Sequence, residues 1–400
     1  MERRGWPPHT VETLPWSQQF RGGTREDREL DTVHTSVPPN IATLNYPPPL
    51  PITVTSEHAL LAVAQADADA EGHSSALSRF MVRSESVASS KIERVSASAE
   101  DFARALGGSR ANTSALSMVA ASTALVTLID SVGARGAFTI GDITAAHHAL
   151  MLDDPDEAPY AGKVRDMQNW IGGSDHSPRD ALYVPPAPAR VQALMDDLII
   201  YLNRDDVPVM VQAAIAHAQF ESIHAYTDGN GRIGRALVSA SLRRRGVTRH
   251  AVVPLASGLL AKRDDYFAAL TTYRAGDPAP IIDVFARSAR AAAVCARDSI
   301  ARLAAIPGEW ELAIKPRAGS AAAVLIPAFF DNPVMNAEEV IALTGGSETR
   351  AYRAIDQLVG EGFITELTGR KRNRVWVASE VLAELNDLDK RINQEMSRQG

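Results

Sequence analysis

Apolar residues recur at helical spacing through most of the chain. In SALSRFMVRSESVASSKIE, the positions that share one helical face include Leu77, Phe80, Met81 and Val87. The same spacing predicts further helices at about 99–106, 112–133, 140–151, 187–203, 208–223, 232–245, 261–274 and 279–306. Strand signals are almost absent until the C-terminus, so we expect a mainly α fold.

Two segments break this pattern. Residues 1–55 are rich in proline, which predicts an extended N-terminal arm with little regular structure, anchored by Trp6 and Trp16. Residues 169–191 place Gly-Gly, Ser-Pro and Pro-Pro pairs around short apolar pieces, which predicts a hairpin-like loop. A plain surface connection is the alternative, but long ordered loops are often functional.

The last part of the chain has its own pattern. Residues 307–320 read as a linker, and residues 321–400 as a separate unit with a helix, a Gly345-Gly346 turn, a second helix and a hairpin. The expected organisation is an arm, N-terminal helices, a core, a linker and a C-terminal unit, at 1–55, 56–110, 111–306, 307–320 and 321–400.

Composition narrows the functional classes. The net charge of the 400-residue chain is −7, so any nucleic-acid binding must be confined to one face of one domain. The single cysteine, Cys295, excludes a disulfide framework. The first residues lack the apolar core of a signal peptide, and we saw no apolar stretch of membrane-spanning length, so we expect a cytoplasmic protein.

The stretch SIHAYTDGNGRIGRAL holds the candidate chemistry. Gly229 to Gly234 spell G-x-G-x-x-G, the fingerprint of dinucleotide-binding folds. That fingerprint needs a strand before it and an acidic residue about 20 positions later. Here a helical pattern precedes the glycines, and no acidic residue lies between Arg235 and Val253. A helix–loop–helix fits the context better.

In such a loop the residues form an anion site. Gly229 and Gly231 allow a tight turn, and free N–H groups at the start of the next helix bind phosphate. Arg232 and Arg235 share one helical face near that end. Two further groups complete the set. Asp228 offers oxygen ligands of the type that Mg²⁺ uses beside phosphates, and His224, at the loop entrance, is a candidate acceptor for the proton of an incoming hydroxyl. The set indicates phosphoryl or nucleotidyl transfer.

HAYTDGNGRIGR resembles the H-x-F-x-(D/E)-G-N-G-R-x-x-R signature of the Fic (Fic/Doc) family. The resemblance implies a Fic helical bundle with a β-hairpin flap and a protein adenylyltransferase that moves AMP from ATP to a side-chain hydroxyl of a target protein or of itself. Ala225 replaces the common Pro, and Tyr226 replaces Phe. The implied roles are general base for His224, Mg²⁺ ligand for Asp228, and nucleotide binding for Gly229, Asn230, Gly231, Arg232, Gly234 and Arg235.

Two further residues lie outside the twelve-residue stretch. RDDYFAAL resembles a family stretch that implies a place for Tyr266 beside the adenine, although a helix-packing tyrosine is an equal alternative. His217 lies two helical turns before His224, and we interpret it as structural rather than as a zinc ligand.

SSKIER resembles the family's inhibitory motif, (S/T)-x-x-x-E-(G/N). The resemblance implies that Glu93 pairs with Arg235 where the γ-phosphate would bind, because a carboxylate competes with phosphate at an arginine site. Arg94 stands where the family has Gly or Asn. A solvated helix carboxylate is the plain alternative. The 169–191 loop matches the family's flap, on which a target segment would add as a strand.

The C-terminal unit resembles the winged helix-turn-helix found in many Fic proteins. Six basic residues are candidate phosphate contacts: Arg350, Arg353, Arg370, Lys371, Arg372 and Arg374. Residues 330–378 also hold seven acidic residues, so a protein-docking or homodimer-forming unit is an alternative to a DNA reader. Two alternatives for the whole chain remain, a nucleotide-sensing transcriptional regulator and an enzyme that removes AMP with the same site.

Overall fold

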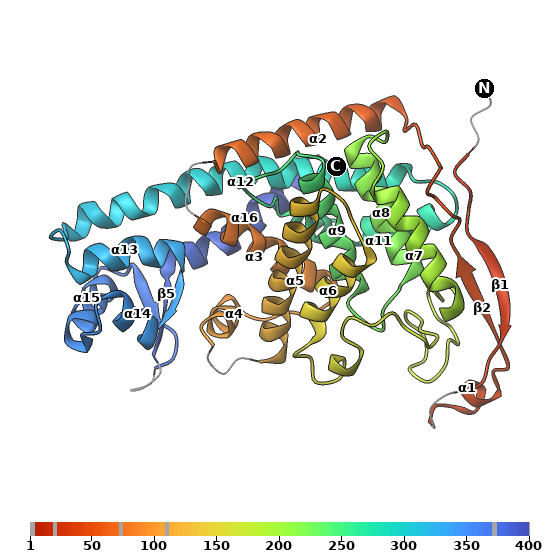
Figure 1. Cartoon of the computed structure of the whole chain (residues 1–400), viewed down its shortest axis with the longest axis horizontal. Coiled ribbons are helices and arrows are strands. Elements are labelled where there is room, and N and C mark those ends of the chain that lie inside the picture. Colours follow the sequence, from red (N-terminus) through yellow and green to blue (C-terminus); the bar gives the residue numbers. More distant parts are fainter. Residues whose placement is uncertain (1–4, 19–21, 72–74, 109–111, 370–373, 400) are drawn as a thin grey trace. The chain divides into compact units, whose positions relative to one another are not determined.

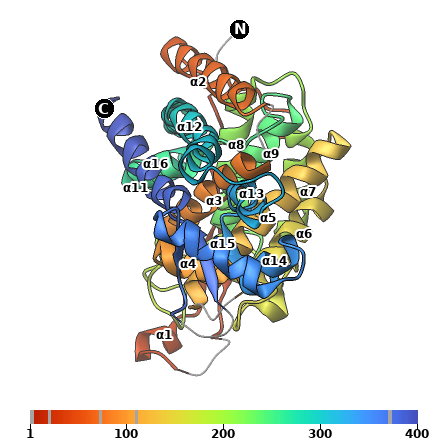
Figure 2. The same cartoon turned by 90° about the vertical axis from the view of Figure 1, so that its left-hand side faces the viewer.

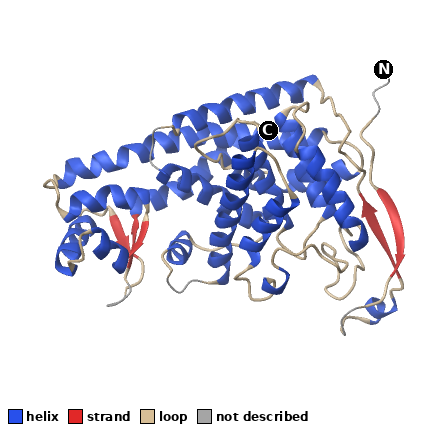
Figure 3. Ribbon diagram, in the orientation of Figure 1, coloured by secondary structure: helices blue, strands red, loops and turns tan. Residues whose placement is uncertain are grey.

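The fold is mainly helical, as expected. The computed structural model describes residues 5–18, 22–71, 75–108, 112–369 and 374–399. In this part of the chain, strands occur only near the N-terminus and in the C-terminal segment (Figure 3). The described chain divides into two compact units that cross the expected domain boundaries: Met1–Glu57, Thr123–Gly246 and Lys262–Ala286 form one, and His58–Ser122, Val247–Ala261 and Arg287–Gly400 the other.

The first unit is built around a central helix, α8 (Val209–Ile223), whose residues from Met210 onward are all buried. A helix that is buried on every side needs neighbours on every side. Antiparallel neighbours α7 (Pro188–Leu202) and α9 (Asn230–Arg244) pack on it, and α6 (Ile140–Met151) packs on both of these (Figure 1). The short connection between α8 and α9 carries the glycine motif.

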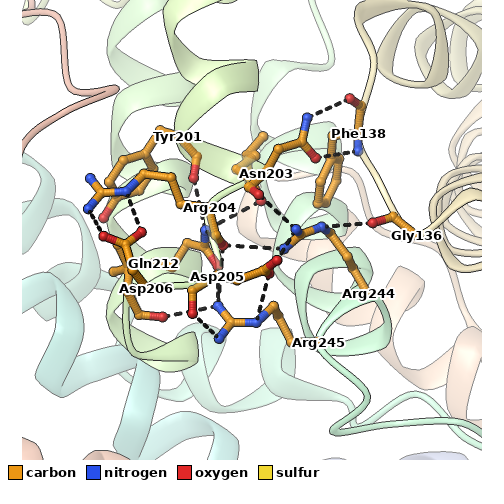
Figure 4. Close-up of polar contacts among 12 residues, drawn as sticks. Gly136, Phe138, Tyr201, Asn203, Arg204, Asp205, Asp206, Gln212, Arg244 and Arg245 are labelled. Carbon is orange, nitrogen blue, oxygen red and sulfur yellow. Dashed lines mark hydrogen bonds and ion pairs between the residues drawn. The ribbon is translucent and has the colours of Figure 1, made fainter.

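Arginines fix the far end of α9. Arg244 donates to the carbonyl of Asn203 at 2.8 Å and to Asp205 at 2.9 Å, and Arg245 donates to Gln212 at 2.9 Å (Figure 4). Asn203 in turn exchanges two hydrogen bonds with the main chain of Phe138. The α7–α8 connection and the segment before α6 are thereby tied to the end of α9 opposite the motif.

The N-terminal arm is more regular than expected. β1 (Thr10–Pro15) pairs antiparallel with β2 (Thr32–Val37), and α1 (Arg25–Glu29) lies between them. The expectation of little regular structure is wrong here, because TVETLP and TVHTSV carry the β-branched residues and alternation of strands. The anchoring role of the two tryptophans is confirmed: Trp6 packs on Tyr46 and Tyr273, and Trp16 packs on Trp170.

The remaining helices follow the sequence pattern, with shifted ends. α2 begins before the expected boundary at Ser56, since proline is compatible with the first helical turn. The expected helix at 261–274 is preceded by a separate short helix, α10. The bounds are α2 Leu50–Asp69, α3 Ser75–Ile92, α4 Ala99–Leu106, α5 Thr113–Arg135, a 3₁₀ turn at Ala158–Tyr160, α10 Leu255–Ala261 and α11 Arg263–Arg274.

The expected linker is wrong in its first half. Helix α12 (Ala279–Ile314) runs through Pro307, so only 315–320 separate it from α13 (Ala321–Asp331). A proline costs an interior hydrogen bond, but burial of Leu303, Ile306 and Trp310 holds the helix together across it.

The C-terminal segment has the expected helix-turn-helix and strands. A third strand, β3 (Val334–Asn336), which the sequence did not reveal, forms an antiparallel sheet with β4 (Ile364–Glu366) and β5 (Val375–Ala378), in the order β3-β5-β4. Trp376 and Ile355 are fully buried. The helices and strands of this segment lie together in Figure 2. Arg370, Lys371 and Arg372 lie outside the described residues. The bounds of the helices are α14 Ala337–Leu343, α15 Glu348–Gly360 and α16 Ser379–Arg398.

One helix corrects the expectation about membrane-spanning stretches. By length and composition alone, α5 could cross a membrane, although 44% of its most apolar window is buried. A single such helix is weak evidence, because a core helix of a soluble protein passes the same test.

Candidate functional site

His224 stands at a strained turn. It is the residue that ends α8, with φ 50° and ψ 61°, and its N–H donates to the carbonyl of Phe220. A non-glycine residue in this left-handed region stores strain, which is common at functional sites. The turn directs the chain away from α8 and into the loop that leads to α9.

Two amides contact the imidazole of His224. Asn230 has its orientation fixed by the main chain of Tyr226, because its Oδ1 accepts from the N–H at 2.9 Å and its Nδ2 donates to the carbonyl at 2.8 Å. That Nδ2 lies 3.2 Å from Nδ1 of His224. From the flap, Nδ2 of Asn169 lies 2.9 Å from the same Nδ1 and 2.9 Å from the Tyr226 carbonyl.

The buried guanidinium of Arg165 supports the turn at His224. Arg165 donates to the carbonyls of His224 at 2.8 Å, Met167 at 3.0 Å and Pro186 at 2.6 Å. Burial holds the pKa of His224 well below its usual range, and the guanidinium groups of Arg165 and Arg274 lower it further. The imidazole is therefore neutral at pH 7, as a proton acceptor must be.

His147 of α6 holds the middle of the loop. Its ring stacks on Tyr226, and its Nε2 lies 3.1 Å from the carbonyl of Asp228. Its Nδ1 accepts from the N–H of Gly162 at 2.9 Å, so the proton is on Nε2, which donates to Asp228. Burial lowers the pKa of His147 to about 4. The sequence did not single out this residue, because a histidine on an apolar helix face carries no local signal.

The anion loop has the predicted form. Gly229 has φ 76° and precedes α9, whose first N–H groups face the loop. Arg232 and Arg235 lie within the first two turns and are buried. The carboxylate of Asp228, by contrast, is 59% exposed and lies 3.2 Å from the guanidinium of Arg232.

Gly234 and Tyr266 do not sit in this loop. A side chain at Gly234 would press against His217 and Glu221, so its place is in the packing of α9 on α8. Tyr266 is 1% exposed, and its hydroxyl lies 2.9 Å from Nε2 of His217. The buried hydrogen bond between Tyr266 and His217 matches the helix-packing alternative for Tyr266. This hydrogen bond and the contact with Gly234 match the structural interpretation of His217.

The 169–191 loop is a hairpin until α7 begins at Pro188. Ile171 pairs antiparallel with Tyr183, and Gln168 donates to the carbonyl of Pro185 at 2.9 Å. The N-terminal arm holds the loop's outer part, because Ser177 donates to Asp27 at 2.6 Å and Ser36 donates to the carbonyl of Val184.

Glu93 follows the last residue of α3, and Arg94 after it has φ 62°. The residue that replaces the family's Gly or Asn thus still adopts the left-handed conformation that those residues favour. Glu93 belongs to the second compact unit and the loop residues to the first, so its inhibitory role stays a prediction.

Within the described residues, no three His, Cys, Asp or Glu side chains cluster closely enough to hold a metal ion. Asp228 fits Mg²⁺ as a single exposed carboxylate, because Mg²⁺ keeps several waters and takes phosphate oxygens.

Comparison with known proteins identifies the core. A model of the Fic/DOC family matches residues 137–242. The chain contains a Fic domain. The matched segment spans the flap and the whole His224 loop, and also His147, Arg165 and Asn169. Tyr266, Glu93 and the C-terminal unit lie outside it.

Curated relatives match the region around the same domain. The chain is 30% identical over 157 residues to protein adenylyltransferase fic-1 of Caenorhabditis briggsae, with 38% of this chain and 27% of that protein covered. It is 32% identical over 157 residues to protein adenylyltransferase Fic of Nematostella vectensis, with 37% and 32% covered. The match thus spans about a third or less of these relatives, and the Fic domain is the shared part.

The fold has a solved counterpart. A Fic family protein from Desulfovibrio desulfuricans G20 aligns with a TM-score of 0.50 at 20% identity, with 84% of this chain and 98% of that chain covered. This likeness concerns the fold alone.

Proposed function

We propose that the chain transfers AMP from ATP to a hydroxyl side chain of a target protein or of itself. The observation that carries the proposal is the meeting of a neutral imidazole, His224, with a helix start that presents N–H groups and two buried arginines, Arg232 and Arg235. Curated relatives of the Fic domain bear the name protein adenylyltransferase.

Each residue of the site has its own role in the proposed transfer step. His224 accepts the proton of the target hydroxyl, whose oxygen forms a bond to the α-phosphorus of ATP while pyrophosphate leaves. The N–H groups of α9 and Arg232 and Arg235 bind the phosphate oxygens, and they stabilise the charge that gathers on the leaving group. Mg²⁺ held by Asp228 would add positive charge beside the same phosphates.

Two further parts belong to this proposal. Glu93 restrains the basal activity by competing with phosphate at Arg235, and the left-handed Arg94 supports the expected end of its helix. A target segment docks on the flap by strand addition, which places its hydroxyl near His224 without a sequence requirement. The reverse reaction, removal of AMP, would use the same groups. That the chain is cytoplasmic stays a prediction.

Intact-mass measurement after incubation with each nucleoside triphosphate and Mg²⁺ tests the proposal. The parent should gain the mass of AMP, either on itself or on a protein from the source lysate, and His224→Ala should not. His58→Ala is the matched control, because His58 is exposed on α2. A gain that survives His224→Ala would overturn the assigned mechanism, and a gain only with another triphosphate would change the donor.

A second candidate function concerns the C-terminal unit, which we propose is a DNA-binding winged helix. Lys315, Arg317, Arg350 and Arg353 line a groove of about 400 Å³, and none of the described residues that line it is acidic. All four are exposed, and Arg350 and Arg353 lie on the second helix of the helix-turn-helix, α15. Cations grouped on this helix and beside the start of α13 suit contact with a phosphate backbone.

Arg374 has other partners. Its guanidinium donates to Glu366 at 2.6 Å and lies over the ring of Trp376, so its charge is neutralised within the unit. Salt-dependent retention of the full chain on duplex DNA tests the proposal. Arg350→Ala and Arg353→Ala should each reduce the salt slope by about one, whereas Arg374→Ala should not. Retention that ignores salt, or unchanged slopes, would favour the protein-docking or homodimer alternative.

A further inference from the structure

The state of the His224 ring is set by its neighbours. Asn230 turns its NH₂ group toward Nδ1, because the main chain of Tyr226 fixes the amide from both sides. Asn169 also turns its NH₂ group toward Nδ1 while it donates to the Tyr226 carbonyl. With two donors facing it, Nδ1 is an acceptor, and the proton of the neutral imidazole is on Nε2.

This tautomer cannot act as the base at Nε2. A ring that accepts the hydroxyl proton at Nε2 must carry its own proton on Nδ1, and that proton needs an acceptor. Asn230 cannot supply one without losing both bonds to Tyr226. Asn169 can, because a half-turn of its amide brings Oδ1 to Nδ1. The turn gives up the bond to the Tyr226 carbonyl and would leave two acceptors facing each other, so the flap must also shift the amide away from that carbonyl, which stays paired with Asn230.

The present orientation of Asn169 is itself incompletely satisfied. Its Oδ1 is buried and has no hydrogen-bond partner among the described residues. A buried polar atom left unpaired is costly, and a half-turn would put the NH₂ group in the same place, so neither orientation of this amide is fully satisfied.

We infer that Asn169 is a positioning residue that selects the tautomer of His224, and that the flap thereby controls when this histidine can act as a base. The inference rests on the proposed AMP transfer. In the transfer step, the hydroxyl oxygen bonds to the α-phosphorus, the bond to the pyrophosphate oxygen breaks, and the hydroxyl proton goes to Nε2. Nδ1–H then donates to Oδ1 of Asn169, which stabilises the imidazolium.

The flap transmits target binding to this amide. Asn169 lies between Gln168, which bridges the two arms of the hairpin, and Ile171, which pairs with Tyr183. A strand that adds to the flap would bond the main chain within two residues of the amide that contacts His224. The base would therefore reach its active tautomer when a target is in place.

Two variants separate the possibilities. The aspartate of Asn169→Asp has nearly the same shape as asparagine and can only accept a hydrogen bond, so it should move the imidazole proton of His224 to Nδ1. The leucine of Asn169→Leu has a similar size and can neither donate nor accept a hydrogen bond. In protein labelled with ¹⁵N-histidine, the His224 signals are assigned by comparison with His224→Ala. We expect Nδ1 unprotonated in the parent and protonated in Asn169→Asp.

Kinetics give the second readout. Asn169→Leu should lower kcat roughly 100-fold, within the range typical for loss of general-base function, and leave KM for ATP unchanged. Asn169→Asp should keep more activity than Asn169→Leu. Its acidic limb should shift to higher pH, because a carboxylate beside the ring offsets the charges of Arg165 and Arg274 that lower the pKa of His224.

Two results would overturn the inference. One is an unchanged protonation pattern and titration of His224 in both variants. The other is a fall in both kcat and melting temperature in Asn169→Leu that is equally large in Asn169→Asp. That result would indicate a structural role only. If the parent transfers no nucleotide, the proposed function fails, while the ¹⁵N signals still decide whether Asn169 sets the tautomer.

Discussion

The imidazole of His147 lies flat against the phenol ring of Tyr226, with ring centroids 3.8 Å apart and an interplanar angle of 8°. The same imidazole donates to the carbonyl of Asp228 and accepts from the N–H of Gly162. One side chain of α6 thus fixes both residues that flank Thr227. The shape of the anion loop depends on His147 in its neutral form.

This dependence predicts acid sensitivity. The pKa of His147 is lowered from 6.5 to about 4 by burial, so the unfolded chain binds this proton at higher pH than the folded chain does. Stability is therefore present above pH 6.5 and is lost as the pH falls toward 4, by roughly 3 kcal/mol for this one group. Urea unfolding at several pH values should show a flatter acid limb for His147→Gln than for the parent.

His58→Gln is the matched control for that series, because His58 is exposed. It should keep the parent's acid limb. If His147→Gln loses stability with falling pH as steeply as the parent does, another buried histidine carries the effect. The candidates are then His9, His217 and His224, because burial lowers the pKa of each to about 3.

The sequence predicted the parts of the site that are local. His224, Asp228, Gly229 and the arginines lie within twelve residues, so their spacing on a helix–loop–helix is readable from the motif. His147, Arg165 and Asn169 are 55 to 77 residues earlier than His224, and only the packing of α6 and of the flap brings them to it. A histidine or an arginine in isolation gives no sign of such a partner.

The errors in the predicted fold also come from contacts between residues that a local sequence pattern does not reveal. Pro307 suggested a break, but apolar residues on either side of it are buried and keep α12 continuous. In the arm, prolines hid two strands whose pairing partners lie about 20 residues apart, beyond the reach of a local pattern. The helix pattern itself was reliable because a face that must be buried repeats every three to four residues.

Replacement of Arg165 should lower the stability of the fold by a large amount. Its guanidinium is buried and pairs with main-chain carbonyls rather than with a carboxylate, and burial lowers its pKa to about 10. Arg165→Met keeps the length but leaves these carbonyls unpaired, which should cost about 3 kcal/mol or more. Chemical denaturation followed by circular dichroism measures the change.

Arg25→Met provides the comparison. Arg25 pairs with Glu29 on the surface of α1, an exposed i,i+4 pair worth less than about 0.5 kcal/mol. Equal losses for the two variants would mean that Arg165 does not support the turn at His224.

The substitution Glu93→Gly should increase the transfer of AMP. If Glu93 competes with the γ-phosphate at Arg235, its removal should raise incorporation of labelled AMP roughly tenfold or more, within the range of typical coupling energies. Glu361→Gly is a matched control, because Glu361 also follows a helix end and precedes a residue with positive φ, Gly362 at 79°. Equal labelling of parent and Glu93→Gly would remove the brake from the proposal while leaving the transfer itself intact.

Gly229→Ala should damage the anion loop itself. At φ 76° an alanine is strained by about 1–2 kcal/mol, and its methyl group would press on Met151 and Leu150 of α6. The ends of these side chains can yield, so we expect a moderate loss of stability together with a larger loss of ATP affinity, because the first N–H groups of α9 move. Gly308→Ala is the control. No atom of the described residues lies within 4 Å of a Cβ added at Gly308, and in a helix the change should stabilise by up to about 1 kcal/mol. Calorimetric titration with ATP and Mg²⁺ beside thermal melting separates the two effects, and an unchanged ATP affinity in Gly229→Ala would show that the loop is not the phosphate site.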